Sequence, residues 1–144
     1  MEAAAVRSYR ALPAPWLGRV GYDRALALQA EAAARALGGD ESLLLLEHEP
    51  VFTLGRNAAR ADVLFTPERC RELGVEVRET NRGGKVTYHG PGQLVGYPIL
   101  ELEDGRHDLH RYVRDIEEAL ILALAGVGVR AGRIAGLTGV WVGD

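Results

Sequence analysis

The residues from Arg82 to Gln93 have the types and spacing best suited to chemistry. They read Arg-Gly-Gly-Lys-Val-Thr-Tyr-His-Gly-Pro-Gly-Gln, and an apolar run, 94–100, follows directly. Glycine lets main chain approach a ligand closely and adopt a positive φ without steric cost. The cationic, hydroxyl and imidazole side chains between the glycines can fix a ligand's orientation. The pattern therefore predicts a ligand-binding loop; the alternative is a tight turn that only precedes a strand.

Hydrophobic patterning predicts the elements that position this loop. Apolar residues recur at helical spacing over about 17–37 and again over 109–124, where Asp108 can cap the helix. Thr66 and Pro67 predict a short helix to about Leu73. Apolar or alternating runs predict strands at 43–46, 51–54, 75–78, 94–100 and 140–142. The interleaving indicates an α/β fold, an α+β mixed sheet flanked by helices, within a single domain of residues 1–144.

Composition narrows the function classes. A formal net charge of −3 gives no sign of a nucleic-acid-binding protein. The longest apolar run, 119–129, is too short to span a bilayer, and residues 1–10 lack the apolar core of a signal peptide. The single cysteine, Cys70, cannot form an internal disulfide and suits a reducing compartment. We expect a cytoplasmic protein that binds neither nucleic acid nor membrane.

Two histidines raise the question of a metal. His107 and His110 flank Asp108, but no cysteine or third ligand is placed to complete a site. We expect no metal.

Three ordered motifs resemble those of the lipoyl(octanoyl) transferase family. The loop 82–93, with Tyr97 on the strand after it, is similar to the family's signature. Residues 47–55, Glu-His-Glu-Pro-Val-Phe-Thr-Leu-Gly, resemble its upstream strand motif. Residues 136–143, Gly-Leu-Thr-Gly-Val-Trp-Val-Gly, resemble the segment before its catalytic lysine. The resemblance covers the whole chain and implies a biotin/lipoyl-protein ligase-like catalytic domain.

The resemblance implies a specific acyl transfer. An octanoyl (lipoyl) group would move from octanoyl-acyl-carrier protein to a lysine on lipoyl domains of 2-oxoacid dehydrogenases and on the glycine cleavage H protein. In the family the intermediate is a cysteine thioester, and a nearby lysine lowers the thiol pKa because the thiolate is the nucleophile. The donor thioester is already activated, so the resemblance implies no nucleotide and no other cofactor.

The resemblance also assigns site residues. The substrate-binding stretch of the family maps onto Arg82, Gly83, Gly84, Lys85, Val86, Thr87, Tyr88 and His89. Loop N–H groups would face the acyl carbonyl, while His89 would orient or polarise the thioester unless loop backbone satisfies it. Tyr97 and His48 are expected to support the site from behind, or to be structural. Cys70 and the side chain of Lys85 are expected to take no part in catalysis.

The family's catalytic pair is not among these residues. Its lysine follows the Val-Trp-Val-Gly segment, and its cysteine lies further on, in an Asn-Pro-Cys-Gly context. A strand at 140–142 followed by Gly143-Asp144 also predicts a hairpin that continues, since the strand has no return partner. The hypothesis is a domain lacking its C-terminal third, with nucleophile and lysine beyond Asp144.

Two other functions stay open. An ATP-dependent lipoate- or biotin-protein ligase shares the expected fold, but the residues 90–93 that follow His89, Gly-Pro-Gly-Gln, favour the transferase. A truncated, non-catalytic module that binds acyl chains or lipoyl domains is the second alternative.

Overall fold

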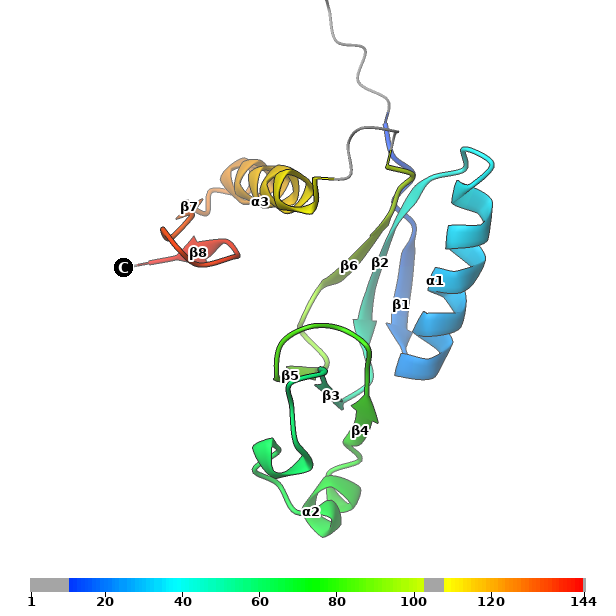
Figure 1. Ribbon diagram of the computed structural model, residues 1–144, viewed down its shortest axis with the longest axis vertical. Coiled ribbons are helices and arrows are strands. Elements are labelled where there is room, and N and C mark those ends of the chain that lie inside the picture. Colours follow the sequence, from blue (N-terminus) through cyan, green and yellow to red (C-terminus); the bar gives the residue numbers. More distant parts are fainter. Residues whose placement is uncertain (1–10, 103–107, 144) are drawn as a thin grey trace, which may run out of the picture. The chain divides into compact units, whose positions relative to one another are not determined.

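Strands and helices interleave along the chain in the computed structural model of the protein (Figure 1), which confirms the expected mixed α/β class. The structure describes residues 11–102 and 108–143. They form two compact units, the first ending at Glu101 and the second beginning at Leu102. The expectations for residues 1–10 and for His107 lie outside the described residues. The assignment of residues 1–144 to one domain stays a prediction.

The first unit contains six strands in two mixed sheets. Its elements are β1 (Trp16–Val20), α1 (Tyr22–Ala36), β2 (Ser42–His48), β3 (Val51–Leu54), a 3-10 turn (Arg60–Asp62), α2 (Pro67–Glu72), β4 (Glu76–Glu79), β5 (Val86–His89) and β6 (Val95–Ile99). The strand orders are β1-β2-β6 and β4-β3-β5, so the expectation of one sheet is wrong. In each sheet the central strand has one parallel and one antiparallel neighbour.

The antiparallel pairs of the two sheets, β2 with β6 and β3 with β5, follow one another along the same two stretches of the chain. β2 pairs with β6 up to Leu46 opposite Val95, and β3 pairs with β5 from Val51 opposite His89. Between these pairs, residues 47–50 lie opposite residues 90–94, which are one residue longer. Pro50 interrupts its strand because proline lacks the N–H that a ladder needs. The segment 82–93 is therefore not one loop: its middle is strand β5.

The first helix begins later than the periodicity predicted. Residues 16–20 form β1, which pairs in parallel with β2, and the register shifts between Trp16 and Arg19. Gly18 lies at that shift with a φ of 74°, a value that glycine adopts without strain. The local helical pattern was overridden by pairing with a distant strand. By contrast, α2 starts as predicted, with the Thr66 hydroxyl accepting the N–H of Arg69 at 3.2 Å.

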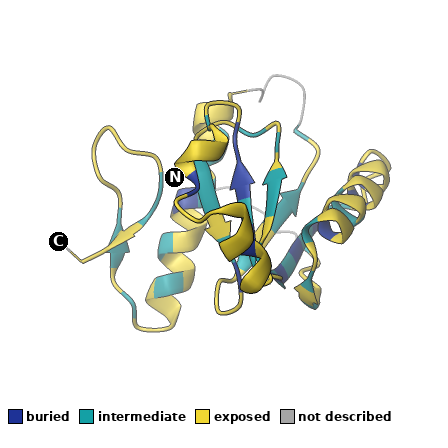
Figure 2. Ribbon diagram, turned by 90° about the horizontal axis from the view of Figure 1, so that it is seen from below, coloured by how far each residue is buried: buried dark blue, intermediate teal, exposed yellow. Residues whose placement is uncertain are grey.

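Most buried residues of the first unit lie on α1 and along the central strands β2 and β3 (Figure 2). α1 packs against β2 and β6 through small side chains, and Ala25, Ala32 and Ala36 are its buried residues. β2 alternates between buried and partly buried residues, the period of a strand. A second cluster, of Leu54, Val63 and Cys70, lies under β3 and α2.

The second unit contains α3 (Leu109–Gly126), β7 (Ala131–Gly132) and β8 (Trp141–Val142). Asp108 caps α3 as expected, accepting the N–H groups of His110 and Arg111 at 3.0 and 3.1 Å. β8 pairs antiparallel with β7. The expectation that the strand at 140–142 has no partner is therefore wrong, because the short β7 gave no pattern of its own in the sequence.

Candidate functional site

Arg82 turns its guanidinium onto the protein's own backbone. Its Nη2 donates to the carbonyls of Thr53 at 2.6 Å and Lys85 at 2.9 Å, and Nη1 donates to the Gly83 carbonyl at 2.9 Å. Further bonds reach the hydroxyls of Thr53, at 2.9 and 3.2 Å, and Thr87, at 3.0 Å. Such a fork matches the planar geometry of guanidinium. The side chain therefore pins the turn 83–85 against β3 and β5.

Backbone N–H groups of residues 55–57, directly after β3, donate hydrogen bonds to carbonyl groups of residues 82–85. Gly55 N–H donates to Lys85 O at 3.0 Å, and Arg56 N–H donates to Arg82 O at 2.9 Å. The N–H of Asn57 lies 3.3 Å from Gly84 O. Gly55 is buried, and a Cβ there would lie 2.7 Å from the Gly83 carbonyl oxygen and closer still to that of Gly84. Only glycine permits this approach.

In residues 82–85 the carbonyl groups are hydrogen-bonded, whereas two of the N–H groups have no partner among the described residues. No hydrogen bond in the described parts of the chain involves the N–H groups of Gly83 and Gly84, and both residues are exposed. Gly84 has a φ of 82°. Successive N–H groups around a left-handed residue form a concave donor site for anionic or carbonyl oxygen. The segment can thus offer donors to a ligand while its acceptors are occupied.

His48, at the end of β2, is completely buried and held at both ring nitrogens. Its Nδ1 lies 3.1 Å from the Val20 carbonyl and its Nε2 lies 2.7 Å from the Tyr97 hydroxyl. A carbonyl only accepts, so Nδ1 carries the proton and Nε2 accepts from Tyr97. Burial lowers the pKa of His48, a shift that the Val20 bond opposes and His89 adds to. His48 is therefore a neutral imidazole with both ring nitrogens bound inside the protein.

Tyr97, on β6, completes an aromatic cluster around His48. Burial raises the pKa of Tyr97 to about 12, so the hydroxyl remains a donor at neutral pH. The rings of Tyr22, His89 and Tyr97 have centroids 5.4, 5.6 and 6.0 Å from that of His48. The structure thus brings together three residues that the sequence nominated. Tyr22 was missed, since nothing in the sequence distinguishes it from a core aromatic at a helix start.

His89 is held differently from His48. Its Nδ1 lies 2.6 Å from Oε1 of Gln93, and its side chain is half-buried. Gln93 belongs to the motif, but it was not nominated as a site residue. The contact places a polar side chain from each end of the 90–92 turn side by side.

The remaining nominated residues divide between β5 and the surface. Lys85 is exposed and forms no ion pair within the described ranges. Val86 and Thr87 are partly buried on β5. Tyr88 is 46% exposed, and its ring packs 5.3 Å from that of Phe52. None of these side chains has a geometry that indicates acid–base chemistry.

Cys70 is buried on α2, where Arg60 Nη2 lies 3.9 Å from its sulfur. Over residues 11–102 and 108–143, no three His, Cys, Asp or Glu side chains lie together as a metal site would need. None of the helices among these residues is long and apolar enough to cross a membrane.

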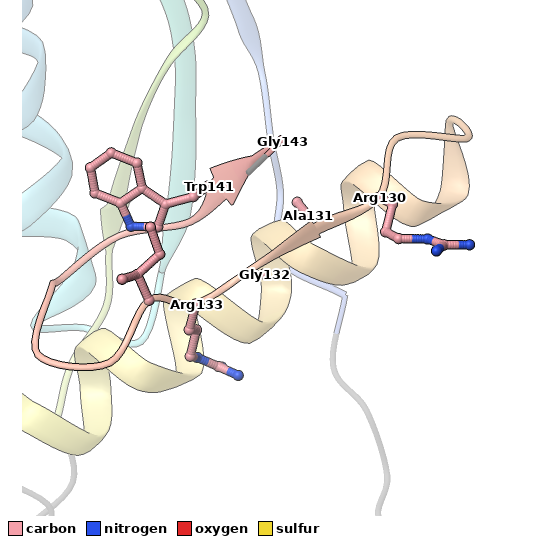
Figure 3. Close-up of a pocket in the computed structure, with 7 residues that line it drawn as sticks. Arg130, Ala131, Gly132, Arg133, Trp141 and Gly143 are labelled. Atoms are coloured by element: carbon pink, nitrogen blue, oxygen red, sulfur yellow. The ribbon is translucent and has the colours of Figure 1, made fainter.

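The second unit contains a buried carboxylate, Glu117, that links several of its segments, and an open depression. Glu117 is buried and accepts the Gly139 N–H at 2.8 Å, the Arg114 guanidinium at 2.9 Å and that of Arg133 at 3.0 Å. The Gly139 bond is the main cause that lowers the pKa of Glu117. A depression of about 450 Å³ lies along β7 and β8 (Figure 3). It is lined by Arg130, Ala131, Gly132, Arg133, Ile134, Trp141 and Gly143, none of them a nominated site residue.

A model of the lipoyl protein ligase A/B catalytic domain matches residues 21–144. The chain belongs to this family. Curated relatives named octanoyltransferase include those of Acidobacterium capsulatum, 53% identical over 87% of this chain, and Solibacter usitatus, 51% identical over 89%. The chain covers 54% and 59% of those two proteins. It therefore spans little more than half the length of these relatives.

Solved structures of the family share the fold at low identity. A bipartite lipoate protein ligase of Thermoplasma acidophilum, described with its E2 lipoyl domain, aligns with a TM-score of 0.72 and 21% identity over 93% of this chain and 52% of its own. A lipoate-protein ligase A bound with ATP aligns with a TM-score of 0.71 and 19% identity over 92% of this chain and 57% of its own. The expected ligase-like fold is confirmed.

Proposed function

We propose that this chain carries the acyl-binding part of an octanoyltransferase. Its curated relatives at about half identity bear that name, while the ligases resemble it in fold alone. One observation carries the proposal on the structural side. The segment Arg82–Lys85 has its carbonyls engaged and the N–H groups of Gly83 and Gly84 unengaged within the described residues. Those donors suit the oxygen of an acyl group.

The chemistry would proceed by two acyl transfers. A thiolate attacks the octanoyl thioester of acyl-carrier protein, and the carbonyl oxygen gains negative charge as the new C–S bond forms. The oxygen loses that charge when the C–S bond to the carrier breaks and the carrier leaves as its thiolate. The Gly83 and Gly84 N–H groups would stabilise that charge. A lysine amine of the lipoyl domain then attacks the enzyme thioester, loses a proton and releases the thiolate. The nucleophilic cysteine and its neighbouring lysine are expected beyond Asp144.

The partners follow from this proposal. Octanoyl-acyl-carrier protein is the donor, and lipoyl domains of 2-oxoacid dehydrogenases and the glycine cleavage H protein are the acceptors. One solved family member is described together with a lipoyl domain, which supports acceptors of that kind. A cytoplasmic location is part of the same proposal.

The nucleotide-dependent ligase is the main rival. It is favoured by one finding, the structural similarity to a lipoate-protein ligase bound with ATP. That similarity has 19% identity, against 53% for an octanoyltransferase. Micromolar ATP binding by calorimetry would move the proposal to the ligase.

An acyl-transfer assay tests the proposal directly. The intact protein that contains this chain is incubated with octanoyl-acyl-carrier protein, then with a lipoyl domain, and both proteins are weighed by mass spectrometry. We expect an octanoyl adduct on the enzyme and then on the acceptor, without ATP. Acceptor labelling only with free octanoate and ATP would identify a ligase, and no adduct under either condition would leave a binding module. A Cys70→Ser variant is the matched control and should form the same adduct.

A further inference from the structure

We propose that Gln93 is a positioning residue that holds His89 with its proton on Nδ1 and keeps Nε2 free as a hydrogen-bond acceptor. The inference deepens the proposed acyl transfer and rests on it for its catalytic meaning. The position of the proton on His89 follows from the contacts of the two side chains alone.

The orientation of the Gln93 amide decides the tautomer. Oε1 lies 2.6 Å from His89 Nδ1, and Nε2 lies 3.5 Å from the Tyr88 carbonyl, at the limit of a hydrogen bond. Turning the amide over would place Oε1 beside that carbonyl, acceptor against acceptor. The oxygen therefore faces His89, and an oxygen can only accept. Nδ1 must donate, so a neutral His89 carries no proton on Nε2.

The sequence Gly90-Pro91-Gly92-Gln93 explains how the two side chains meet. Gln93 N–H donates to the Gly90 carbonyl at 3.1 Å, which closes a four-residue turn. Proline at the second position and Gly92 at the third, with a φ of 88°, match a type II turn. His89 directly precedes this turn and Gln93 is its fourth residue, so the two side chains leave the chain at neighbouring points. The turn 90–93 thus brings the Gln93 amide to the imidazole of His89 and orients that ring.

His48 shows by contrast what is unusual about His89. Both nitrogens of His48 are bound inside the protein. For His89 only Nδ1 has a partner among residues 11–102 and 108–143. His48 is the titratable ring in contact with His89, and since burial lowers its pKa it stays neutral near pH 7. The free nitrogen of the pair is Nε2 of His89.

The free nitrogen has a defined task in the proposed transfer. The acceptor lysine must lose a proton as its nitrogen bonds to the acyl carbon and the C–S bond breaks. Nε2 can take that proton, giving an imidazolium whose Nδ1–H stays on Gln93, and can return it to the departing sulfur. Gln93 fixes the ring without adding negative charge, unlike the carboxylate partner of many catalytic histidines.

The tautomer can be observed without any assay of activity. In the intact protein with 15N-labelled histidine, the His89 resonances should show a protonated Nδ1 and an unprotonated Nε2. Gln93→Met keeps the side-chain length but has no amide, and it should yield a mixture of tautomers. Leu94→Ala, at the exposed neighbouring residue, is the control and should leave the signals unchanged. A wild-type proton on Nε2, or a tautomer unchanged in Gln93→Met, would overturn the proposal.

Activity then separates this inference from the proposed function. Gln93→Met should lower kcat roughly 10- to 100-fold with little change in KM, as for other partners that orient a reacting group. Gln93→Glu should place a carboxylate beside His89, favour its imidazolium form and move the acidic limb of the pH–rate profile to higher pH. An unchanged kcat and pH profile would refute the catalytic role. If the tautomer is as expected but the intact wild-type protein transfers no octanoyl group, the proposed function fails and the positioning of His89 stands.

Discussion

The two ends of the segment 82–93 differ in what their polar side chains bind. At Arg82–Lys85 the guanidinium bonds three carbonyls and two hydroxyl groups of its surroundings. At Gly90–Gln93 a neutral amide and a tight turn orient a single imidazole. The side chain at the first end holds the backbone of the turn 83–85, and the side chain at the second end orients His89. The charged side chain of Arg82 is therefore bound to the protein's own backbone, while the uncharged Gln93 contacts the imidazole of His89.

This difference gives the first and largest prediction. Arg82→Met should destabilise the protein by about 3–4 kcal/mol, because several acceptors around Thr53 and Lys85 lose a charged donor. Arg82→Lys should recover only part of this loss, since one ammonium cannot replace the fork. Urea denaturation measures both. Unchanged stability together with lost substrate binding would mean that Arg82 contacts ligand instead.

Gly55→Ala tests the same end from the other side. A methyl group there meets the backbone of Gly83 and Gly84, so the turn must move, at a cost of about 1–3 kcal/mol. Gly83→Ala is the matched control for stability, because nothing lies within 4 Å of a Cβ at that position. Equal melting temperatures for the two variants would contradict the close packing described.

Tyr97→Phe probes the support behind His89. It removes the hydroxyl that donates to His48 Nε2 and leaves a buried acceptor without a partner, costing about 1–2 kcal/mol. Thermal unfolding at pH 8 measures the change. A stability equal to wild type would show that this hydrogen bond contributes nothing net.

The pH dependence of stability should carry the signature of His48. Burial lowers its pKa in the folded state below the usual histidine value of 6.5, so the unfolded chain binds the proton more readily. This contribution is complete above pH 6.5 and is lost as the pH falls from 6.5 toward the folded pKa. His48→Asn should flatten that part of the stability curve, whereas His110→Gln, at an exposed histidine, should not. A slope that survives in His48→Asn would assign it to another group.

The smallest effect is expected at Cys70. Cys70→Ser places a hydroxyl in a buried apolar cluster and should cost about 1 kcal/mol, with transferase activity intact. Chemical denaturation and the acyl-transfer assay measure the two effects. Loss of activity in a folded variant would return this thiol to the list of catalytic candidates.

The sequence correctly predicted those elements that depend on interactions between residues close together in the chain. The Thr66 and Asp108 caps and most strands were predicted correctly because capping and alternation act over a few residues. β1 was taken for helix, and β5 was hidden inside an apparent loop, because each forms by pairing with a distant strand. The motif residues His48, His89 and Tyr97 do meet. The internal use of Arg82 was not predicted, since residue type alone does not reveal which way a charge turns.

The unequal lengths of 47–50 and 90–94 have a consequence for how such a site can change. A residue inserted within β5 or β6 would shift the pairing and exchange the two faces of the sheet. The 90–94 stretch lies between two separately registered ladders, so it can vary in length or sequence while both pairings persist. The group that aims His89 is therefore exchangeable, and the scaffold can acquire a new partner for its histidine without refolding.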